Sequence, residues 1–410
     1  MRRRRSKRRQ RSAVEWGIRG TAALAAAFLA YASVSATLAN VVVRIDPVHA
    51  HRLSPSDGQI TAAAAEQSFA LTPDASIDSE VTRLAQLALR QDATAVSALS
   101  VLGLQAQLRR DVTGARELFS YSHQLSRREL RTQIWAIEEA VARGDIASAL
   151  EHYDRALRTS RRARDILFPV LARAIAEPVV RAPLLETLSS DSAWGRAFIR
   201  YVAANAPEPQ AVVLFFREGA RAGLPIEDDD RSRLVNALVA EGATDEAWSL
   251  YDSFRREASR ERSRDPNFEL RTQVPAVFDW TALNPQGLAA SIQRGEDGGV
   301  VHFSAGSGAG GTVLRQMQLL PPGLYRIEGR SRGIDQPEYS RPYWALTCHD
   351  GQELGRVPLP SSGDTPASFT GRFRVPSECP VQTLSLVVRA SDAIAGIQGQ
   401  IDTVQLVPVS

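Results

Sequence analysis

The stretch Arg109-Arg110-Asp111-Val112-Thr113-Gly114-Ala115 recurs as Arg143-Gly144-Asp145-Ile146-Ala147-Ser148-Ala149, at an offset of 145 − 111 = 34 residues. Apolar residues around both copies recur at three- and four-residue spacing, which is typical of amphipathic helices. Arg143-Gly144-Asp145 reads as a turn between two helices, with Asp145 placed to cap the second one. The pattern predicts a helical array over residues 77–262 that contains repeated helix pairs.

The repeat resembles the tetratricopeptide family, whose units are 34 residues long. The resemblance covers under half of the region beyond the membrane segment, and Leu99 and Ala106 stand where that family commonly has Trp and Tyr. It implies a concave face that binds a protein partner, whereas the alternative is a helical spacer. The residues expected to pack the repeats are Leu102, Gly103, Ala115, Phe119, Gly144, Ala149, Tyr153 and Ala156.

From Asn267 onward the apolar pattern changes to a period of two, as in Phe369, Gly371, Phe373 and Val375. Turn residues such as Pro321-Pro322-Gly323 separate the runs. Roughly eight strands in residues 266–410 predict an antiparallel β-sandwich, most simply a jelly roll. The candidate strands include 299–304, 313–320, 324–329, 343–348, 368–375, 383–389 and 400–407.

This C-terminal region resembles carbohydrate-binding-module-like jelly rolls. Three segments carry the resemblance: Phe278-Asp279-Trp280, Pro322 to Arg326, and Ile401 to Leu406. It implies a possible contact with polysaccharide, in which aromatic faces stack on sugar rings. The candidates are Tyr339, Tyr343 and Trp344, and the alternative for each is an ordinary place in the core or on the surface.

Cys348 and Cys379 are the two cysteines of the chain. An oxidising compartment favours a disulfide between them, while two separate buried thiols are the alternative. Closing a loop of this length would stabilise the fold by about 3–4 kcal/mol on the chain-entropy model. A zinc site is not expected, because no fourth ligand is spaced to join the cysteines and His349.

An uncharged stretch of 24 residues lies between Arg19 and Arg44. About 20 apolar residues span a bilayer as a helix, so residues 20–43 are predicted to be a transmembrane signal-anchor. The rival interpretation is a cleaved signal peptide. Residues 1–19 hold nine basic side chains and one acid, a charge of +8, and positive flanks stay in the cytoplasm. The rest of the chain is then expected outside.

The remaining charge argues against nucleic-acid binding. The whole chain carries +3 and the first 19 residues +8, so residues 20–410 sum to 3 − 8 = −5. A mildly acidic body lacks the overall positive balance of nucleic-acid-binding proteins.

The sequence contains no motif for enzymatic chemistry that its surrounding residues support. The stretch from Gly306 to Gly311 matches G-x-G-x-x-G formally, but it precedes a strand-like run and reads as a loop between strands. A Walker A motif is absent, because Lys7 is the only lysine. The histidines have no metal-ligand spacing and no carboxylate pair stands out. We therefore expect no catalytic residue, no cofactor and no metal.

The sequence predicts a multidomain α plus β protein with a single transmembrane helix, a tetratricopeptide-like solenoid and a β-sandwich. The segments are a basic cytoplasmic tail (1–19), the transmembrane helix (20–43), a tether (44–76), the helical domain (77–262) and the sandwich (266–410). The leading hypothesis is a non-enzymatic scaffold of the bacterial inner membrane with a periplasmic bulk, which serves envelope polysaccharide assembly or export. Its helical repeats would bind a protein partner, and its β-sandwich would contact glycan or another subunit. The alternatives are a glycan-binding module on a helical stalk and a glycan-acting enzyme.

Overall fold

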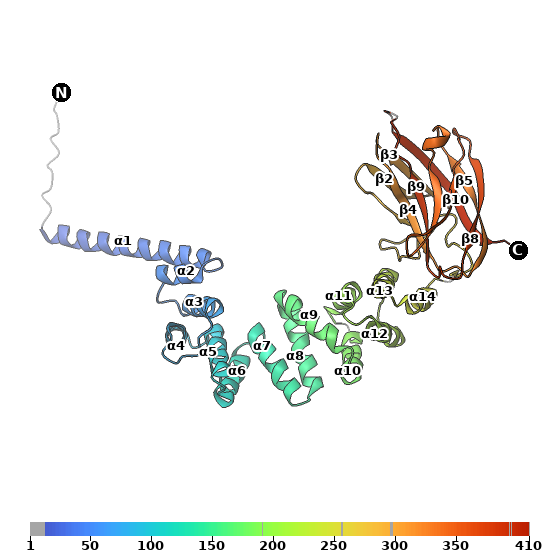
Figure 1. Ribbon diagram of the computed structural model, residues 1–410. Helices are drawn as coiled ribbons and strands as arrows, with labels where there is room; N and C mark the ends of the chain where they lie inside the picture. The colour runs from blue at the N-terminus through green and yellow to red at the C-terminus, as the bar shows by residue number, and fades with distance from the viewer. Residues whose placement is uncertain are drawn as a thin grey trace, which may run out of the picture. The chain divides into compact units, whose positions relative to one another are not determined.

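The computed structural model describes residues 13–190, 192–255, 257–295, 298–392, 394 and 396–409. Figure 1 shows a series of helices followed by two β-sheets. The chain forms two compact units, one up to Leu167 and one from Phe168 onward, which are described separately below.

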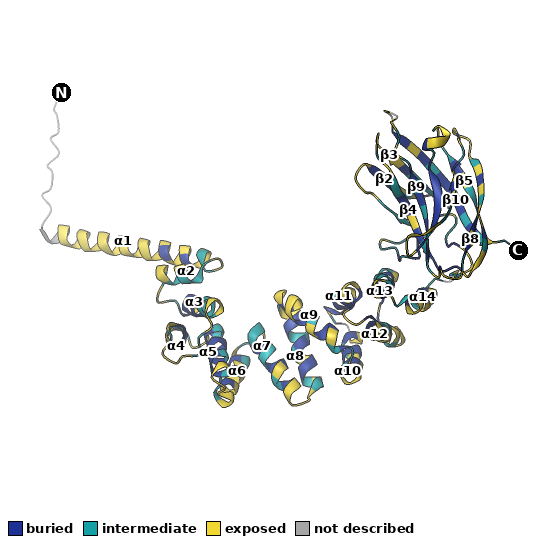
Figure 2. Cartoon of the chain, in the orientation of Figure 1, coloured by how far each residue is buried: buried dark blue, intermediate teal, exposed yellow. Residues whose placement is uncertain are grey.

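The first unit begins with one long apolar helix, α1 (Ala13–Val42). Within it, Trp16–Val42 is long and apolar enough to cross a membrane, which is compatible with a single-pass anchor or a signal sequence. Most of its side chains are exposed (Figure 2), and Ala39 is a buried exception that packs with Ala50 and Ile60 of the next two helices. The expected span, residues 20–43, lies within this helix except for its last residue.

The predicted tether, residues 44–76, contains two helices, and the second covers the alanine-rich piece 61–70, whose sequence indicates a short helix. These are α2 (Pro47–Leu53) and α3 (Gly58–Leu71), which starts at the capping carboxylate of Asp57. Ala62 and Ala65 of α3 are fully or almost fully buried in a cluster that includes Ala85 and Ala88 of α4 (Glu80–Gln91). Alanine faces let these helices approach closely, and their burial stabilises a segment that is punctuated by prolines.

Two helix pairs follow at the interval of the sequence repeat. The first pair is α5 (Val96–Leu108) and α6 (Val112–Leu125), and the second is α7 (Leu130–Ala142) and α8 (Ile146–Thr159). The first residue of α7 lies 130 − 96 = 34 positions after that of α5, and the first residue of α8 lies 146 − 112 = 34 positions after that of α6. Asp111 and Asp145 cap α6 and α8, and each accepts a backbone hydrogen bond three residues ahead.

The residues expected to pack this repeat are buried, half-buried or in a turn between helices. Phe119 is fully buried, lies against Gly103 and stacks on Trp135 of the next pair at 4.9 Å between ring centroids. Leu102 is half-buried, and Gly144 lies in the α7–α8 turn with a φ of 71°. The other buried members of the set are Ala115, Ala149, Tyr153 and Ala156.

Helices of the second unit continue where the sequence repeat fades. They follow α9 (Arg162–Ala174), a helix that contains the division between the units. Their core is aromatic and includes Phe168, Trp194, Phe198 and Phe215. The helices are α10 (Pro178–Ser189), α11 (Gly195–Asn205), α12 (Pro209–Arg221), α13 (Asp228–Ala240) and α14 (Thr244–Asp252).

The second unit ends in two antiparallel five-stranded sheets that pack face to face. The first sheet has the order β1 (Thr281–Ala282), β4 (Gly311–Gln318), β9 (Gln382–Val388), β6 (Tyr343–Cys348) and β7 (Glu353–Pro358). The second has the order β2 (Leu288–Gly295), β3 (Gly298–Ala305), β10 (Ile397–Pro408), β5 (Gly323–Arg332) and β8 (Ala367–Val375).

The chain crosses repeatedly between these sheets, as in a jelly roll. Inward-facing residues of both sheets form one hydrophobic core, and Figure 2 shows the buried stretches of the strands in dark blue. The sequence-based strands correspond to seven of the ten strands, whereas β1, β2 and β7 were not predicted.

An irregular segment joins α14 to β1. Asn236 of α13 binds it at two points, since its amide donates to the Pro275 carbonyl at 3.1 Å and accepts from the Val277 N–H at 2.7 Å. On the sandwich side, the Ser263 N–H donates to the Leu406 carbonyl at 2.9 Å. The segment therefore packs against both the last helices and the sandwich.

The side chain of Arg264 is buried within this segment. Its Nε donates to the Phe278 carbonyl at 2.9 Å, and its guanidinium lies 5.4 Å from the centre of the Trp248 ring. Burial lowers the pKa of Arg264 to about 10, so the side chain stays charged at neutral pH.

Candidate functional site

A cleft of about 460 Å³ lies on the outer face of the second sheet, over β2, β3 and β10. Apart from the buried Phe303, the residues that line it are small or polar. The lining residues are Ala289, Ala290, Ser291, His302, Phe303, Ser304, Gly333, Asp364, Gln398, Gly399 and Gln400.

Strand register brings the polar members of the cleft together. Ser291 of β2 pairs with His302 of β3, which pairs with Gln400 of β10. In the next outward row, Ala289 pairs with Ser304, which pairs with Gln398. Outward side chains two residues apart on one strand point to the same face, so both rows project into the cleft.

Small residues keep the cleft open. Ala289 ends the second row with a methyl group, and Gly333 lines the cleft without a side chain. At Gly399 a Cβ atom would lie 2.6 Å from the Phe303 ring, so glycine lets β10 pass close over the core. A larger residue at any of these places would fill the hollow or push the strand outward.

The polar groups of the cleft are available to a ligand. Within the part of the chain that the structure describes, the side chains of Ser291, His302, Ser304, Gln398 and Gln400 have no hydrogen-bond partner. Ser304 and Gln398 are exposed, while His302 and Gln400 are half-buried. Hydroxyl, amide and imidazole groups together supply both donors and acceptors. The arrangement suits a ligand that also carries many donors and acceptors.

Charge is sparse in the cleft itself and is concentrated beside it. Asp364 is the single carboxylate among the lining residues. Gln400 pairs in register with Arg332 of β5, whose Nε lies 3.0 and 3.1 Å from the two carboxylate oxygens of Asp402. The cleft therefore borders a charged region of the same sheet face.

The three aromatic residues proposed for sugar stacking lie in different environments. Trp344 is fully buried in the core, where its ring packs 5.7 Å from Trp280, so its candidacy is corrected in favour of the core alternative. Tyr343 is 9% exposed and faces outward from the other sheet. Two guanidinium groups, of Arg356 and Arg389, lie 4.8 and 4.9 Å from its ring centre.

Tyr339 is the accessible member of the three, with 78% of its surface exposed. It lies on a short 3-10 helix, η1 (Glu338–Ser340), in the connection between β5 and β6. Gln336 of the same connection donates to the carbonyl of Gly396, two residues before the cleft residue Gln398. The connection that carries Tyr339 is therefore joined at Gln336 to the backbone just before β10.

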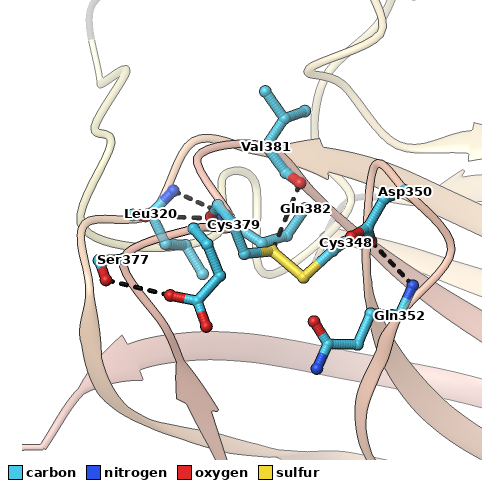
Figure 3. Close-up of a disulfide and its surroundings, with 9 residues drawn as sticks. Leu320, Cys348, Asp350, Gln352, Ser377, Cys379, Val381 and Gln382 are labelled. Carbon is cyan, nitrogen blue, oxygen red and sulfur yellow. Dashed lines mark hydrogen bonds between the residues drawn. A yellow bond between two sulfur atoms is a disulfide. The ribbon is translucent and has the colours of Figure 1, made fainter.

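The two cysteines form a disulfide, which confirms the predicted pairing. Cys348 ends β6 and Cys379 lies in the connection between β8 and β9, with 5.6 Å between their Cα atoms (Figure 3). Gln382 lies next to the disulfide, and its side-chain oxygen accepts a 2.9 Å hydrogen bond from the N–H of Leu320. The disulfide is structural and lies on elements other than those of the cleft.

Two further hollows lie among the helices and the irregular segment. One of about 560 Å³ is lined by Tyr251, Arg255, Arg264 and Asp279, among others. Two of its carboxylates hold the fold: Asp279 accepts hydrogen bonds from Tyr251 and Ala276, and Asp265 accepts from the Glu269 and Leu270 N–H groups. A groove of about 610 Å³ between α12, α13 and α14 mixes apolar and charged side chains.

The described residues include no group of three or more His, Cys, Asp or Glu arranged to hold a metal ion. The stretch 306–310 is a loop between β3 and β4, as the sequence predicted for this glycine-rich motif.

The cleft residues were not singled out from the sequence, which had directed attention to aromatic rings. A signal was present, however. His302 and Ser304 alternate with apolar Val301, Phe303 and Ala305, and Gln398 and Gln400 alternate with Ile397 and Ile401. Two polar outer faces of this kind mark strands with one solvent-exposed side.

Comparisons with known proteins place the chain in no family. No family model matches it, and no curated protein matches it. Solved structures that resemble it include a CBM4 module, with 14% identity over 37% of this chain and 99% of that chain at a TM-score of 0.26. Another is the CBM22-1 xylan-binding domain of Xyn10C from Paenibacillus barcinonensis, with 14% identity over 35% and 92% at 0.25.

A third is the enzymatically active domain of tailspike protein 4 from bacteriophage CBA120, with 11% identity and a TM-score of 0.24. This match covers 32% of the present chain and only 19% of the tailspike chain. Likenesses at this level define neither a family nor a ligand for the chain.

Proposed function

We propose that this protein is a non-enzymatic, membrane-anchored scaffold whose β-sandwich binds a glycan in the cleft over β2, β3 and β10. The observation that carries the proposal is the set of unpartnered polar side chains in that cleft, Ser291, His302, Ser304, Gln398 and Gln400. Sugars present hydroxyl groups that both donate and accept, and amides, hydroxyls and imidazole match them. The exposed ring of Tyr339, on the connection that Gln336 joins to the backbone of Gly396, is a further candidate surface for stacking.

The location rests on the N-terminal helix and the disulfide. Trp16–Val42 has the length and hydropathy of a membrane span, and arginine-rich residues 1–19 favour a cytoplasmic N-terminus. The Cys348–Cys379 disulfide favours an oxidising compartment for the sandwich. We propose the bacterial inner membrane, with the bulk of the protein in the periplasm.

The helix pairs support a second role, the binding of a protein partner. The 34-residue interval between the pairs α5–α6 and α7–α8 is that of tetratricopeptide repeats, which commonly bind proteins. In the alternative, the helices serve only as a stalk for a glycan-binding module. The two roles are distinguished by whether a protein partner binds to a variant whose cleft residues have been substituted.

A glycan-acting enzyme is the less supported reading. Most glycosidases use two carboxylates that flank the bond to be cut. The cleft lining contains one carboxylate, Asp364. In the hollow beside α14, the carboxylates of Asp265 and Asp279 accept hydrogen bonds that hold the irregular segment.

Binding of glycans to the full-length protein in uncharged detergent micelles tests the proposal. A panel of bacterial envelope polysaccharides would be titrated against wild type and the variants Gln398→Ala and Gln400→Ala. We expect at least one glycan to bind and each variant to weaken it several-fold, because each side chain lost removes hydrogen bonds to sugar hydroxyls.

Gln352→Ala is the matched control, since Gln352 is exposed on the turn between β6 and β7, on the other sheet. Failure of every glycan to bind, or unchanged affinity in both cleft variants, would overturn the proposal. A purified protein partner that binds wild type and Gln398→Ala equally would support the scaffold role, and a chain that binds only glycan would support the stalk.

A further inference from the structure

The outer face of β5 and β8 is rich in arginine. Outward positions two residues apart carry Arg326, Arg330 and Arg332 on β5, and Arg372 and Arg374 on β8. Arg326, Arg330, Arg372 and Arg374 are exposed, and Arg332 is half-buried. We call these five residues the arginine face.

Carboxylates balance only part of this charge. Glu328 lies 2.8 Å from Arg326, and Asp402 lies 2.8 Å from Arg332. Among the described residues, no carboxylate forms an ion pair with Arg330, Arg372 or Arg374. Five positive side chains against two negative ones leave a local charge of 5 − 2 = +3, whereas residues 20–410 together carry −5. The arginine face is therefore positively charged, whereas residues 20–410 as a whole are negatively charged.

Strand register makes this arrangement unfavourable without a ligand. Arg326 and Arg372 are directly opposite each other on neighbouring strands. Like charges in such cross-strand pairs destabilise a sheet, and Glu328 offsets only one of the two. An anion held between the guanidinium groups would remove the repulsion.

The arginine face continues the polar cleft on the same sheet. β10 is followed by β5 and then by β8, and Gln400 of the cleft is in register with Arg332. Neighbouring strands are about 4.8 Å apart, so a chain lying across the sheet would pass from the cleft to the arginines within about 10–15 Å. One extended ligand can thus reach both regions.

We infer that the ligand of this sheet is an acidic polysaccharide, whose hydroxyls occupy the cleft and whose carboxylates pair with the arginine face. The inference rests on the proposed glycan binding and adds the chemical class of the glycan. Planar guanidinium groups suit this role because they bind carboxylates through two parallel hydrogen bonds. The unpaired residues Arg330, Arg372 and Arg374 are the expected contacts.

The surface of the arginine face favours a sugar polymer over a lipid bilayer or single-stranded nucleic acid. Proteins that lie on membranes insert aromatic or aliphatic side chains below the headgroups, and those that bind single strands stack bases on aromatic rings. In the described part of the sandwich, Tyr339 and Ile394 are the large hydrophobic residues classed as exposed, and neither lies on β10, β5 or β8.

The test compares charged and uncharged polymers on the full-length protein in uncharged detergent micelles. The probes are polygalacturonate and dextran of similar length, titrated at 50 and 500 mM NaCl. We expect polygalacturonate to bind at least 10-fold more tightly than dextran at low salt, and to lose most of that advantage at high salt. The triple variant R330Q/R372Q/R374Q should lose the preference for polygalacturonate over dextran at both salt concentrations.

The matched control for charge is a pair of single variants. Arg372→Gln should weaken polygalacturonate binding, whereas Arg315→Gln should not, because Arg315 is exposed on β4 of the other sheet. Far-ultraviolet circular dichroism and the thermal midpoint check that each variant keeps its fold. All of these arginines are at the surface, so loss of folding is not expected.

The outcomes separate this inference from the proposed function. If dextran binds as tightly as polygalacturonate and the triple variant changes neither, the inference is overturned while glycan binding stands. If neither polymer nor any envelope polysaccharide binds, both are overturned. Tighter binding of anionic lipid vesicles or of single-stranded DNA than of polygalacturonate would also overturn it.

Discussion

The phenolic hydroxyl of Tyr251 donates a 2.7 Å hydrogen bond to Oδ1 of Asp279, which links the last helix to the segment just before the first strand. Asp279 is 3% exposed, and its other oxygen accepts from the N–H of Ala276 at 3.0 Å. Burial, followed by the neighbouring charge of Asp279, raises the pKa of Tyr251. The hydroxyl therefore stays protonated and remains a donor at any physiological pH.

Tyr251→Phe removes this donor and leaves a buried carboxylate oxygen without it. We expect the free energy of unfolding to fall by about 1.5–3 kcal/mol, the range for a hydrogen bond to a charged group. Urea unfolding followed by tryptophan fluorescence measures the change. Tyr339→Phe serves as the control and should leave stability unchanged, because that ring is 78% exposed.

The histidine pair of α6 and α8 predicts a pH dependence of stability. His123 and His152 lie with their ring centres 5.5 Å apart, and His152 also contacts the Gln133 amide at 2.9 Å. Burial lowers the pKa of both histidines, and the positive charge of Arg155 lowers it further. In the unfolded chain both should titrate near the ordinary value of about 6.5.

Because the native pKa is the lower one, the unfolded state binds more protons as pH falls below about 6.5. The free energy of unfolding should decrease from pH 7.5 to pH 5.5. The double variant His123→Gln/His152→Gln should show a smaller decrease, and parallel curves for variant and wild type would contradict the prediction. Chemical unfolding at the two pH values provides the measurement.

Reduction of the Cys348–Cys379 disulfide should destabilise the sandwich. The two residues are 31 positions apart, and a closed loop of that length contributes about 3–4 kcal/mol through the entropy of the unfolded chain. The midpoint of thermal unfolding is expected to drop when a reductant is added. A Cys348→Ser/Cys379→Ser variant should begin at the lower midpoint and show no response to reductant.

Gly103 should not tolerate a larger side chain. A Cβ atom there would lie 2.8 Å from the buried ring of Phe119, too close for the two helices to keep their spacing. Gly103→Leu should cost about 1–3 kcal/mol through overpacking. Gly363→Leu is the comparison, since that glycine has open space around it, and equal losses in the two variants would refute this packing role.

The helix pairs could be predicted from the sequence because their determinants are local. Asp111 and Asp145 mark the start of a helix by capping it, and the following apolar residues define the buried face. The alanine-rich piece 61–70 indicates a short helix within the tether, whereas the burial of α3 against Ala85 and Ala88 of α4 is a tertiary contact that no local pattern reveals.

The missed strands have weak local signals. β2 reads Leu-Ala-Ala-Ser-Ile-Gln-Arg-Gly, with a single β-branched residue, and is held by its register with β3. The short β7 contains Gly355 and ends at Pro358 at a sheet edge. In both cases pairing with a neighbour outweighs intrinsic propensity.

The candidate site was less predictable than the fold. Its residues come from β2, β3 and β10, which are brought together by sheet order and register over about 110 positions of sequence. Trp344 was a candidate for sugar stacking with a place in the core as its alternative, and it is fully buried in the core. A large aromatic ring in a strand can serve either role, so the sequence alone could not decide between them.

The position of β8 gives its arginines a second consequence. It is the outermost strand of its sheet, and an outermost strand can recruit another copy to extend the sheet. Two copies that met at this border would bring Arg372 and Arg374 of one against the same residues of the other. Mutual repulsion between these side chains would disfavour such edge-to-edge pairing of two copies.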